Sequence, residues 1–252
     1  MSLSIATSGK GGVGKTTVCA LLVRYLIETG KGPVLAVDAD PNSCLGALLG
    51  MEPEKKIAEL REEANDPDNV PSGVPKARMV ENWLNEIIEE GRGFDLLTMG
   101  RPEGPRCYCY VNDLLRRFLS RLKKSYPVVV IDNEAGMEHL SRLTTDNVDC
   151  LVIVSEPTTP SVRTVGRILE LAGGLPIKVG RRAMLFNKAK NGSVPDVVRR
   201  QAESLPISTA MELSYSQPLE QLSERGSSIF ELPGNLQDDL QLSKIVQWCL
   251  SG

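Results

Sequence analysis

Short apolar runs rich in β-branched residues alternate with helical patterns along the whole chain. The runs that predict strands are residues 3–8, 34–38, 94–98, 128–132, 151–155 and 183–187. Several of them, such as 128–131, are continuously apolar, as expected of strands that are covered on both faces. The alternation predicts one α/β domain over residues 1–252, with a mostly parallel central sheet and helices on both of its faces.

The helical patterns cover residues 16–28, 111–124, 162–172 and 194–203, and a last one covers 236–250. This last helix is apolar without a lysine-rich side, so we expect it to pack onto the sheet rather than to anchor a membrane. The least regular region is 51–80, where an acidic helix is followed by a segment with three prolines and a glycine. This region is predicted to be an irregular connection or a lid over the site.

Composition and charge narrow the class of protein. Hydrophobic residues make up 41% of the 252 residues, which is typical of a globular chain. The net charge of −3 provides no overall field for a polyanion, so nucleic acid is not an expected partner. No run approaches the ~20 apolar residues of a membrane span, and the first residues are too short for a signal peptide. We therefore expect a cytoplasmic protein with no membrane partner.

A glycine-rich motif follows the first predicted strand directly and satisfies the pattern G-x-x-x-x-G-K-[ST]. In such a loop the backbone N–H groups turn toward phosphates, a lysine supplies positive charge and a hydroxyl binds Mg²⁺. Lys15 and Thr16 are the residues in those two places, so Thr16 is the predicted Mg²⁺ ligand. The whole predicted phosphate site consists of Gly9, Lys10, Gly11, Gly12, Val13, Gly14, Lys15, Thr16 and Thr17.

Carboxylates end two further predicted strands. Asp38 and Asp40 stand two residues apart, where they could hold the water shell of a metal and orient an attacking water. Asp132 closes the apolar run 128–131, the usual position of a carboxylate that positions Mg²⁺, and the N–H of Gly136 is predicted to contact the terminal phosphate. Aspartates at strand ends also cap helices, which remains an alternative role for Asp40 and Asp132.

Asn187 and Lys188 end the run 183–187 in a way that is similar to the base-reading element N-K-x-D. In that element the final aspartate accepts hydrogen bonds from guanine. The fourth position here is Lys190, which cannot accept them. The sequence therefore favours ATP over GTP, with Asn187 and Lys188 near the base.

Cys107 and Cys109 form a C-x-C pair, and in a chain with six cysteines and no sign of secretion such thiols are free or bind metal. Two such pairs across a two-fold axis would complete a Cys₄ set, tetrahedral for Zn²⁺ or square-planar for Ni²⁺. The spacing alone leaves two alternatives open, an oxidisable dithiol and two inert buried thiols.

The lysine after the first glycine, Lys10, makes the loop resemble the deviant P-loop of the SIMIBI class, which includes MinD, ParA and the nitrogenase iron protein. The resemblance implies an ATP-driven homodimer in which Lys10 reaches the partner's nucleotide. It also implies that Asp40 orients the hydrolytic water and that Asp38 and Asp132 lie around Mg²⁺. Catalysis would then rest on Asp40, Lys10 and Lys15.

Residues 100–110, 37–46 and 135–140 resemble the CooC/AcsF family of nickel-insertion ATPases. The resemblance implies that Cys107 and Cys109 bind Ni²⁺ or Zn²⁺ at a dimer interface. It also implies that apo carbon monoxide dehydrogenase or acetyl-CoA synthase is the client. The alternative is a MinD- or ParA-like positioning ATPase that acts on membrane or DNA. For His139, the one histidine, a local hydrogen-bonding role is expected, with a transient nickel ligand as the alternative.

Overall fold

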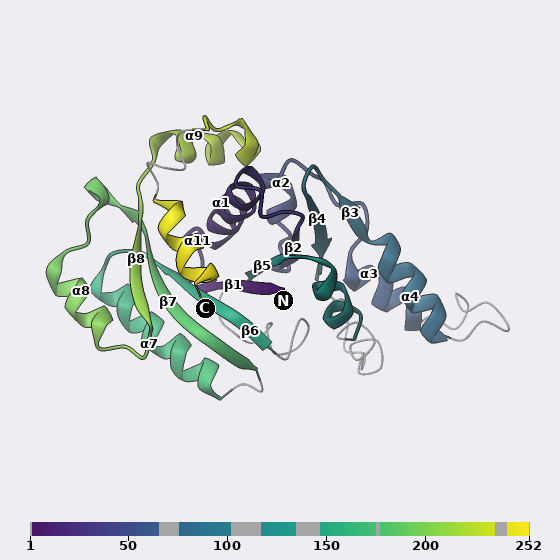
Figure 1. Ribbon diagram of the computed structural model, residues 1–252, viewed down its shortest axis with the longest axis horizontal. Helices are drawn as coiled ribbons and strands as arrows, with labels where there is room; N and C mark the ends of the chain where they lie inside the picture. Colours follow the sequence, from purple (N-terminus) through teal and green to yellow (C-terminus); the bar gives the residue numbers. More distant parts are fainter. Residues whose placement is uncertain are drawn as a thin grey trace.

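One eight-stranded sheet organises the protein, in the order β3-β4-β2-β5-β1-β6-β7-β8 (Figure 1). The computed structural model describes residues 2–65, 76–101, 117–134, 147–174, 177–234 and 241–251. Every strand pairing in these parts is parallel except that of β3 with β4. The strands are β1 Leu3–Gly9, β2 Val34–Ala39, β3 Ile88–Glu90, β4 Phe94–Thr98, β5 Val128–Asn133, β6 Asn147–Ser155, β7 Lys178–Ala189 and β8 Thr209–Ser214. The predicted fold class is confirmed, and so are the six predicted strands.

Helices cover both faces of the sheet because neighbouring strand residues point to opposite sides. Val129 and Ile131 of β5 belong to one apolar cluster and Val130 to the other. The first cluster includes residues of α3, α4, α7 and α8, and the second includes residues of α1 and α11. The helices are α1 Lys15–Glu28, α2 Leu45–Leu48, α3 Ile57–Asn65, α4 Lys76–Glu86, α7 Thr159–Gly173, α8 Asp196–Glu203, α9 Gln217–Arg225 and α11 Leu242–Leu250, with 3₁₀ turns η2 Lys123–Ser125, η3 Lys190–Gly192 and η4 Ile229–Glu231.

The region 51–80 contains more helix than the sequence predicts. The acidic helix is present as α3, but α4 already begins at Lys76, where irregular chain is expected. Met79 and Leu84 of α4 are buried, so packing against the core stabilises this helix. Residues 66–75 lie outside the described residues, as do 111–116 of the predicted helix 111–124 and 236–240 of the last one. As predicted, α11 packs against the sheet, with Ile245 and Val246 in the core.

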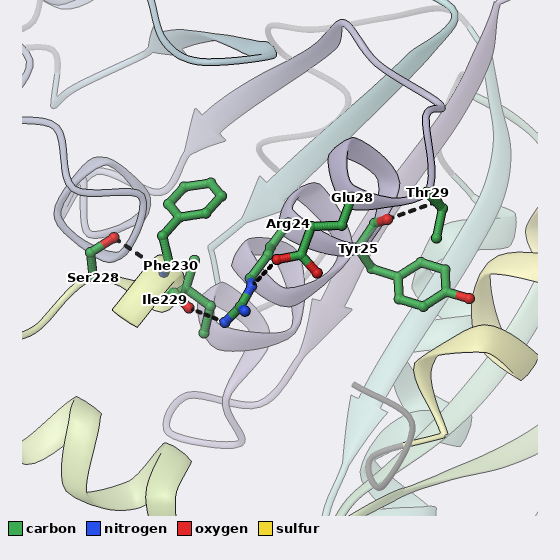
Figure 2. A network of polar contacts seen from close by, with 7 residues as sticks. All are labelled: Arg24, Tyr25, Glu28, Thr29, Ser228, Ile229 and Phe230. Atoms are coloured by element: carbon green, nitrogen blue, oxygen red, sulfur yellow. Dashed lines mark hydrogen bonds and ion pairs between the residues drawn. The ribbon is translucent and has the colours of Figure 1, made fainter. Parts of the chain in front are cut away.

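A buried arginine fixes α1 in place (Figure 2). Arg24 is only 4% exposed, and its Nε donates a hydrogen bond of 2.7 Å to Glu28 Oε1. Its Nη1 donates a bond of 2.6 Å to the backbone oxygen of Ile229, at the start of η4. Ser228, which caps η4, donates from Oγ to the Leu48 carbonyl at the end of α2. The segment around η4 therefore holds α1 and α2 together, and these two helices follow directly on the loops of the candidate site.

The strand order reverses at β1: strands β2 to β5 lie on one side of it and strands β6 to β8 on the other. In open α/β sheets, ligands bind beyond the carboxyl ends of the strands at such a reversal. The ends of β1, β2 and β5 meet there, and the register places Asp38 opposite Asp132 on neighbouring strands. The residues that the sequence singles out on separate strands are thus brought to one edge of the sheet.

Candidate nucleotide-binding site

A pocket of about 500 Å³ opens at this edge of the sheet. One side of it is the glycine-rich loop with the start of α1, and the opposite side comes from the ends of β7 and β8 and from α9. Among the predicted residues, the pocket is lined by Gly11, Gly12, Gly14, Lys15, Thr16, Thr17, Asp40, Asn187 and Lys188. The fold therefore places the predicted phosphate loop, Asp40 and the predicted base-reading pair around one space.

Close contacts with neighbouring segments exclude a side chain at two positions of the loop. Gly9 has φ +150°, and a Cβ there would lie 2.3 Å from the Val154 carbonyl oxygen. Gly14 has φ +91°, and a Cβ there would lie 2.5 Å from Asn187 Nδ2. Around Gly11 and Gly12, in contrast, a Cβ would meet no atom within 4 Å. The loop is thus fastened at its ends, and the backbone between them faces open space that a phosphate chain can occupy.

Lys15 is the first residue of α1 and is buried, with 7% of its surface exposed. Its Nζ donates a long hydrogen bond of 3.4 Å to the Lys10 carbonyl oxygen, so the ammonium group curls back over the loop. A buried ammonium group needs a negatively charged partner to offset its desolvation. Lys15 is therefore poised to hold an anion at the helix N-terminus.

Asp132 is fully buried and keeps one carboxylate oxygen free of hydrogen bonds. Thr7 Oγ1 donates to its Oδ1 at 3.3 Å and the Thr16 hydroxyl also bonds to the carboxylate, whereas Oδ2 has no partner. Burial raises the pKa of Asp132 to about 6, against the lowering effects of the Thr16 hydrogen bond and the Lys15 charge. An unpartnered buried oxygen beside a threonine hydroxyl suits a hydrated divalent cation.

Asp38 is also fully buried, but both of its oxygens are in use. Oδ1 accepts from the Asp40 backbone N–H at 3.2 Å, and Oδ2 accepts from the Leu45 N–H at 2.8 Å, at the start of α2. Burial raises the pKa of Asp38 to about 7, although the Leu45 hydrogen bond lowers it. Asp38 therefore holds the loop 39–45 in place. This structural role comes in addition to the role near the metal that the sequence predicts.

Asp40 lies at the rim of the pocket, partly exposed. Its Oδ1 accepts two hydrogen bonds of 2.9 Å, from the backbone N–H and from Nδ2 of Asn42. Asn42 also lines the pocket and was not among the predicted site residues. The Asn42 contacts orient the Asp40 carboxylate beside the phosphate loop, where a water molecule could be held.

Asn187 fastens the phosphate loop to β7. Its Nδ2 donates to the Val13 carbonyl oxygen at 2.8 Å, and its Oδ1 accepts from the Lys188 N–H at 2.9 Å. Lys188 has a positive φ of 58° and turns the chain at the pocket wall. Asn187 is thus placed next to the loop, and its side-chain amide bonds both to the loop backbone at Val13 and to the backbone N–H of Lys188.

The far wall of the pocket, where β8 leads into α9, consists of residues that the sequence does not single out. This wall consists of Ser214, Tyr215, Ser216, Leu219, Glu220 and Ser223. Ser216 caps α9 by accepting from the Leu219 N–H at 3.3 Å. The only signal in the sequence is the Ser-Gln-Pro start of a helix, which predicts a helix but gives no sign of a ligand.

The predicted metal ligands Cys107 and Cys109 lie outside the described residues, as do Gly136 and His139. Four other cysteines are described as free thiols, of which Cys44 is exposed. In the described segments, no group of three or more histidine, cysteine, aspartate or glutamate residues is placed to hold a metal ion. Within the same segments, no helix is both long and apolar enough to cross a membrane.

The raised pKa of Asp132 predicts how stability depends on pH in the nucleotide-free protein. Between about pH 4 and 6 the folded state keeps a proton that the unfolded state has lost, so Asp132 makes stability fall as pH rises through this window. Asp132→Asn should therefore raise the free energy of unfolding by about 2 kcal/mol at pH 8 and by almost nothing at pH 4. Urea unfolding at the two pH values measures this, with the exposed Asp196→Asn as the control. An equal effect at both pH values would contradict the pKa argument.

A glycine-rich loop between a parallel strand and a helix, a buried lysine at the helix start and a buried carboxylate on a neighbouring strand define a P-loop nucleotide-binding protein. The donor groups fit Mg²⁺ with a nucleoside triphosphate: the loop N–H groups and Lys15 would hold the phosphates, and Thr16 and Asp132 the hydrated metal. Residues 4–229 match the model of the CobQ/CobB/MinD/ParA nucleotide binding domain, and the chain belongs to this family. It is accordingly a P-loop ATPase.

Two relatives are similar over most of the chain. An uncharacterized ATP-binding protein of Methanocaldococcus jannaschii is 39% identical over 92% of this chain and 92% of its own length. The carbon monoxide dehydrogenase accessory protein CooC of Rhodospirillum rubrum is 36% identical over 70% of this chain and 71% of its own. Among solved structures, a ParA family ATPase from Chlorobium tepidum has a TM-score of 0.67 at 20% identity and covers 99% of both chains. MinD of Pyrococcus horikoshii with Mg-ADP has a TM-score of 0.59 at 22% identity and covers 90% of this chain and 87% of its own.

Proposed function

We propose that this ATPase is a dimeric metallochaperone that delivers nickel to carbon monoxide dehydrogenase or acetyl-CoA synthase. The observation that carries the proposal is the pocket at the phosphate loop, which Asp40 lines, together with the exposed Lys10 on the same loop. The similarity to CooC supports the choice of client, and the C-x-C pair at Cys107 and Cys109 supports a metal cargo.

ATP would lie in the pocket with its phosphates on the glycine-rich loop. Lys15 and the loop N–H groups would bind the phosphates, and Thr16 would bind Mg²⁺, whose water shell Asp132 would hold. Bound Mg²⁺ would neutralise charge on the phosphates during their transfer to water. The nucleoside would extend toward the wall formed by β8 and α9, and we propose adenine there because Lys190 replaces the aspartate that guanine requires.

Hydrolysis would be completed by residues at the rim. The Asp40 carboxylate, oriented by Asn42, would hold the attacking water. Lys10 is exposed at the tip of the loop, so its ammonium group can reach the nucleotide of a second copy and stabilise the charge that develops there. Each site would then be complete only in the dimer.

The cargo site would form between the same two subunits. Cys107 and Cys109 of both chains would supply four thiolates to one Ni²⁺. Because ATP and metal would both favour the closed dimer, each should raise the affinity for the other by the same factor. Hydrolysis would open the dimer and release the metal to the client.

The role of Asp40 predicts a change in hydrolysis without a change in binding. Asp40→Ala should slow ATP hydrolysis by about 100-fold, because the attacking water loses its acceptor. The affinity for ATP should change by no more than about twofold, since the phosphate contacts are intact. Steady-state kinetics and binding of a fluorescent ATP analogue measure the two quantities.

Two further variants serve as comparisons for Asp40→Ala. Asp40→Asn keeps an oxygen for the Asn42 hydrogen bonds but removes the charge, so it should be as slow as Asp40→Ala. Asp196→Ala, which changes an exposed residue at the start of α8, should hydrolyse ATP like wild type. A fully active Asp40→Ala would rule out the assigned role.

If the protein bound vesicles or DNA in the presence of ATP but held no nickel, the proposed cargo would be wrong and a positioning role would replace it.

A further inference from the structure

A buried threonine lies beside the Asp132 carboxylate. Thr7 is on β1, just before the glycine-rich loop. Ile5 of β1 and Val130 of β5 both belong to the apolar cluster that includes residues of α1. Because every second side chain of a strand points to the same face, Thr7 and Asp132 also face α1. Both are fully buried, and Thr7 is not among the residues that line the pocket, so it can act on a nucleotide only through another group.

The Thr7 hydroxyl lies between a thiol and a carboxylate. Its Oγ1 is 3.2 Å from Sγ of Cys19, on α1, and it donates to Asp132 Oδ1 at 3.3 Å. A longer contact of 3.5 Å leads to the Ile131 carbonyl oxygen. A threonine hydroxyl has one proton, and a hydrogen bond to an ionised acceptor is about twice as strong as one to a neutral acceptor. The proton of Thr7 is therefore directed at Asp132.

The Cys19 thiol is a donor to the same hydroxyl. Cys19 is fully buried, and this burial, together with the nearby Asp132 carboxylate, raises the pKa of the thiol well above its ordinary range. The thiol therefore keeps its proton, and Thr7 Oγ1 has lone pairs to accept it. The hydrogen bonds thus run in one direction, from the Cys19 S–H to Thr7 Oγ1 and from the Thr7 O–H to Asp132 Oδ1.

The other oxygen of the carboxylate is left for a ligand. Oδ2 of Asp132 is buried and has no hydrogen-bond partner among the described residues. The Thr7 bond to Oδ1 hinders rotation of the carboxylate group and keeps its two oxygens in distinct places. Carboxylates at metal sites commonly depend on such outer hydrogen bonds, and the loss of one lowers metal affinity or activity by about 10–100-fold.

We propose that Thr7, supported by Cys19, is a positioning residue for ATP hydrolysis, which holds the Asp132 carboxylate so that Oδ2 stays available to the water shell of Mg²⁺. The inference rests on the role proposed above for Asp132. Without the Thr7 hydroxyl the carboxylate can rotate, and part of the free energy of Mg²⁺ binding is then spent on fixing it. Loss of the hydroxyl should therefore weaken Mg²⁺ binding, whereas the contacts of the loop with the phosphates should persist.

The test is a titration with Mg²⁺ of the complex of the protein with a fluorescent ATP analogue. Thr7→Val keeps a β-branched side chain of similar shape, and the bond of 2.7 Å from Asn133 Nδ2 to the Thr7 carbonyl oxygen is retained. This variant should need about tenfold more Mg²⁺ than wild type for half of the fluorescence change. Thr7→Ser keeps the hydroxyl and should need about as much as wild type. Thr7→Ala removes the hydroxyl in a smaller side chain and should give the same increase as Thr7→Val.

Thr98→Val is the matched control. Thr98 is 1% exposed at the end of β4, and its Oγ1 makes no hydrogen bond within the described parts of the chain. The same substitution there should lower or raise stability without changing the Mg²⁺ requirement, and a thermal melt measures the stability of each variant. Equal Mg²⁺ requirements for Thr7→Val and Thr98→Val would overturn the inference.

Asp132→Asn distinguishes failure of this inference from failure of the role of Asp132 itself. If Asp132→Asn needs more Mg²⁺ than wild type but Thr7→Val does not, only the positioning role of Thr7 is wrong. If Asp132→Asn needs no more Mg²⁺ than wild type, the role of Asp132 at the metal is wrong and the inference falls with it.

Infrared spectroscopy of the nucleotide-free protein tests the part played by Cys19. The difference between the spectra of wild type and Cys19→Ala isolates the S–H stretching band of Cys19. The same difference measured in the Thr7→Val protein should place this band at higher frequency, because the thiol has lost its acceptor and the S–H bond is no longer weakened. A band at unchanged frequency would show that the thiol does not donate to Thr7 and would overturn the part assigned to Cys19.

Discussion

Lys15→Ala should lower the rate constant of ATP hydrolysis by about 10²–10³-fold. Its ammonium group is buried at the start of α1 and directed over the loop, so no other described side chain of the pocket lies in the same place to replace it. The loss removes positive charge from the phosphates in the ground state and in the transition state, so ATP affinity should fall as well. Single-turnover hydrolysis at saturating ATP, together with equilibrium binding, measures both losses.

The fold of this variant should be intact, because alanine is a good helix former at the first position of α1. A thermal melt of the nucleotide-free protein checks this point. Lys31→Ala is the matched control, since Lys31 is exposed at the other edge of the sheet and should hydrolyse ATP normally. A Lys15→Ala protein that kept more than about a tenth of wild-type hydrolysis would show that the phosphates lie elsewhere.

Cys107→Ala and Cys109→Ala should each abolish tight nickel binding. The proposed site uses four thiolates, so one substitution per chain removes two of them and leaves an incomplete coordination sphere. Wild-type protein with ATP should hold about one Ni²⁺ per two chains. Equilibrium dialysis followed by metal analysis gives the stoichiometry and the affinity.

A cysteine outside the C-x-C pair provides the control for the nickel experiment. Cys44→Ala removes an exposed thiol beside the Asp40 loop and should bind nickel like wild type. ATP hydrolysis by Cys107→Ala should continue, because the phosphate loop is unchanged. If both C-x-C variants kept the wild-type nickel stoichiometry, the metal would lie elsewhere and the proposed cargo site would be wrong.

The features that depend on local pattern could be predicted from the sequence. The run 128–132 is β5 to within one residue, because four consecutive apolar residues suit a strand covered on both faces. The glycine-rich loop follows β1 as expected, since Gly9 and Gly14 adopt backbone angles that other residues rarely take. Asp132 could be singled out because it lies near the end of a buried strand. Burial of a carboxylate costs free energy, so such a residue usually has a charged partner or a ligand.

The features that depend on tertiary packing could not be predicted. Strand β8, Thr209–Ser214, is mostly half-buried at the edge of the sheet and has no apolar run to reveal it. Ser214 and Ser216 line the pocket only because β8 pairs with β7 and directs the chain back to the phosphate loop. The contact of Cys150 with Cys249 joins residues 99 positions apart, and no short-range pattern encodes it.

The proposed mechanism requires ATP and nickel to bind to the same closed dimer. Asp40→Ala offers a way to hold the ATP-bound state, because it should bind ATP and hydrolyse it slowly. The decisive measurement is the nickel content of monomer and dimer fractions of this variant, separated by size-exclusion chromatography with ATP or with ADP. We predict about one Ni²⁺ per two chains, found in the dimer and only with ATP. Nickel bound equally with both nucleotides, or carried by the monomer, would contradict the account.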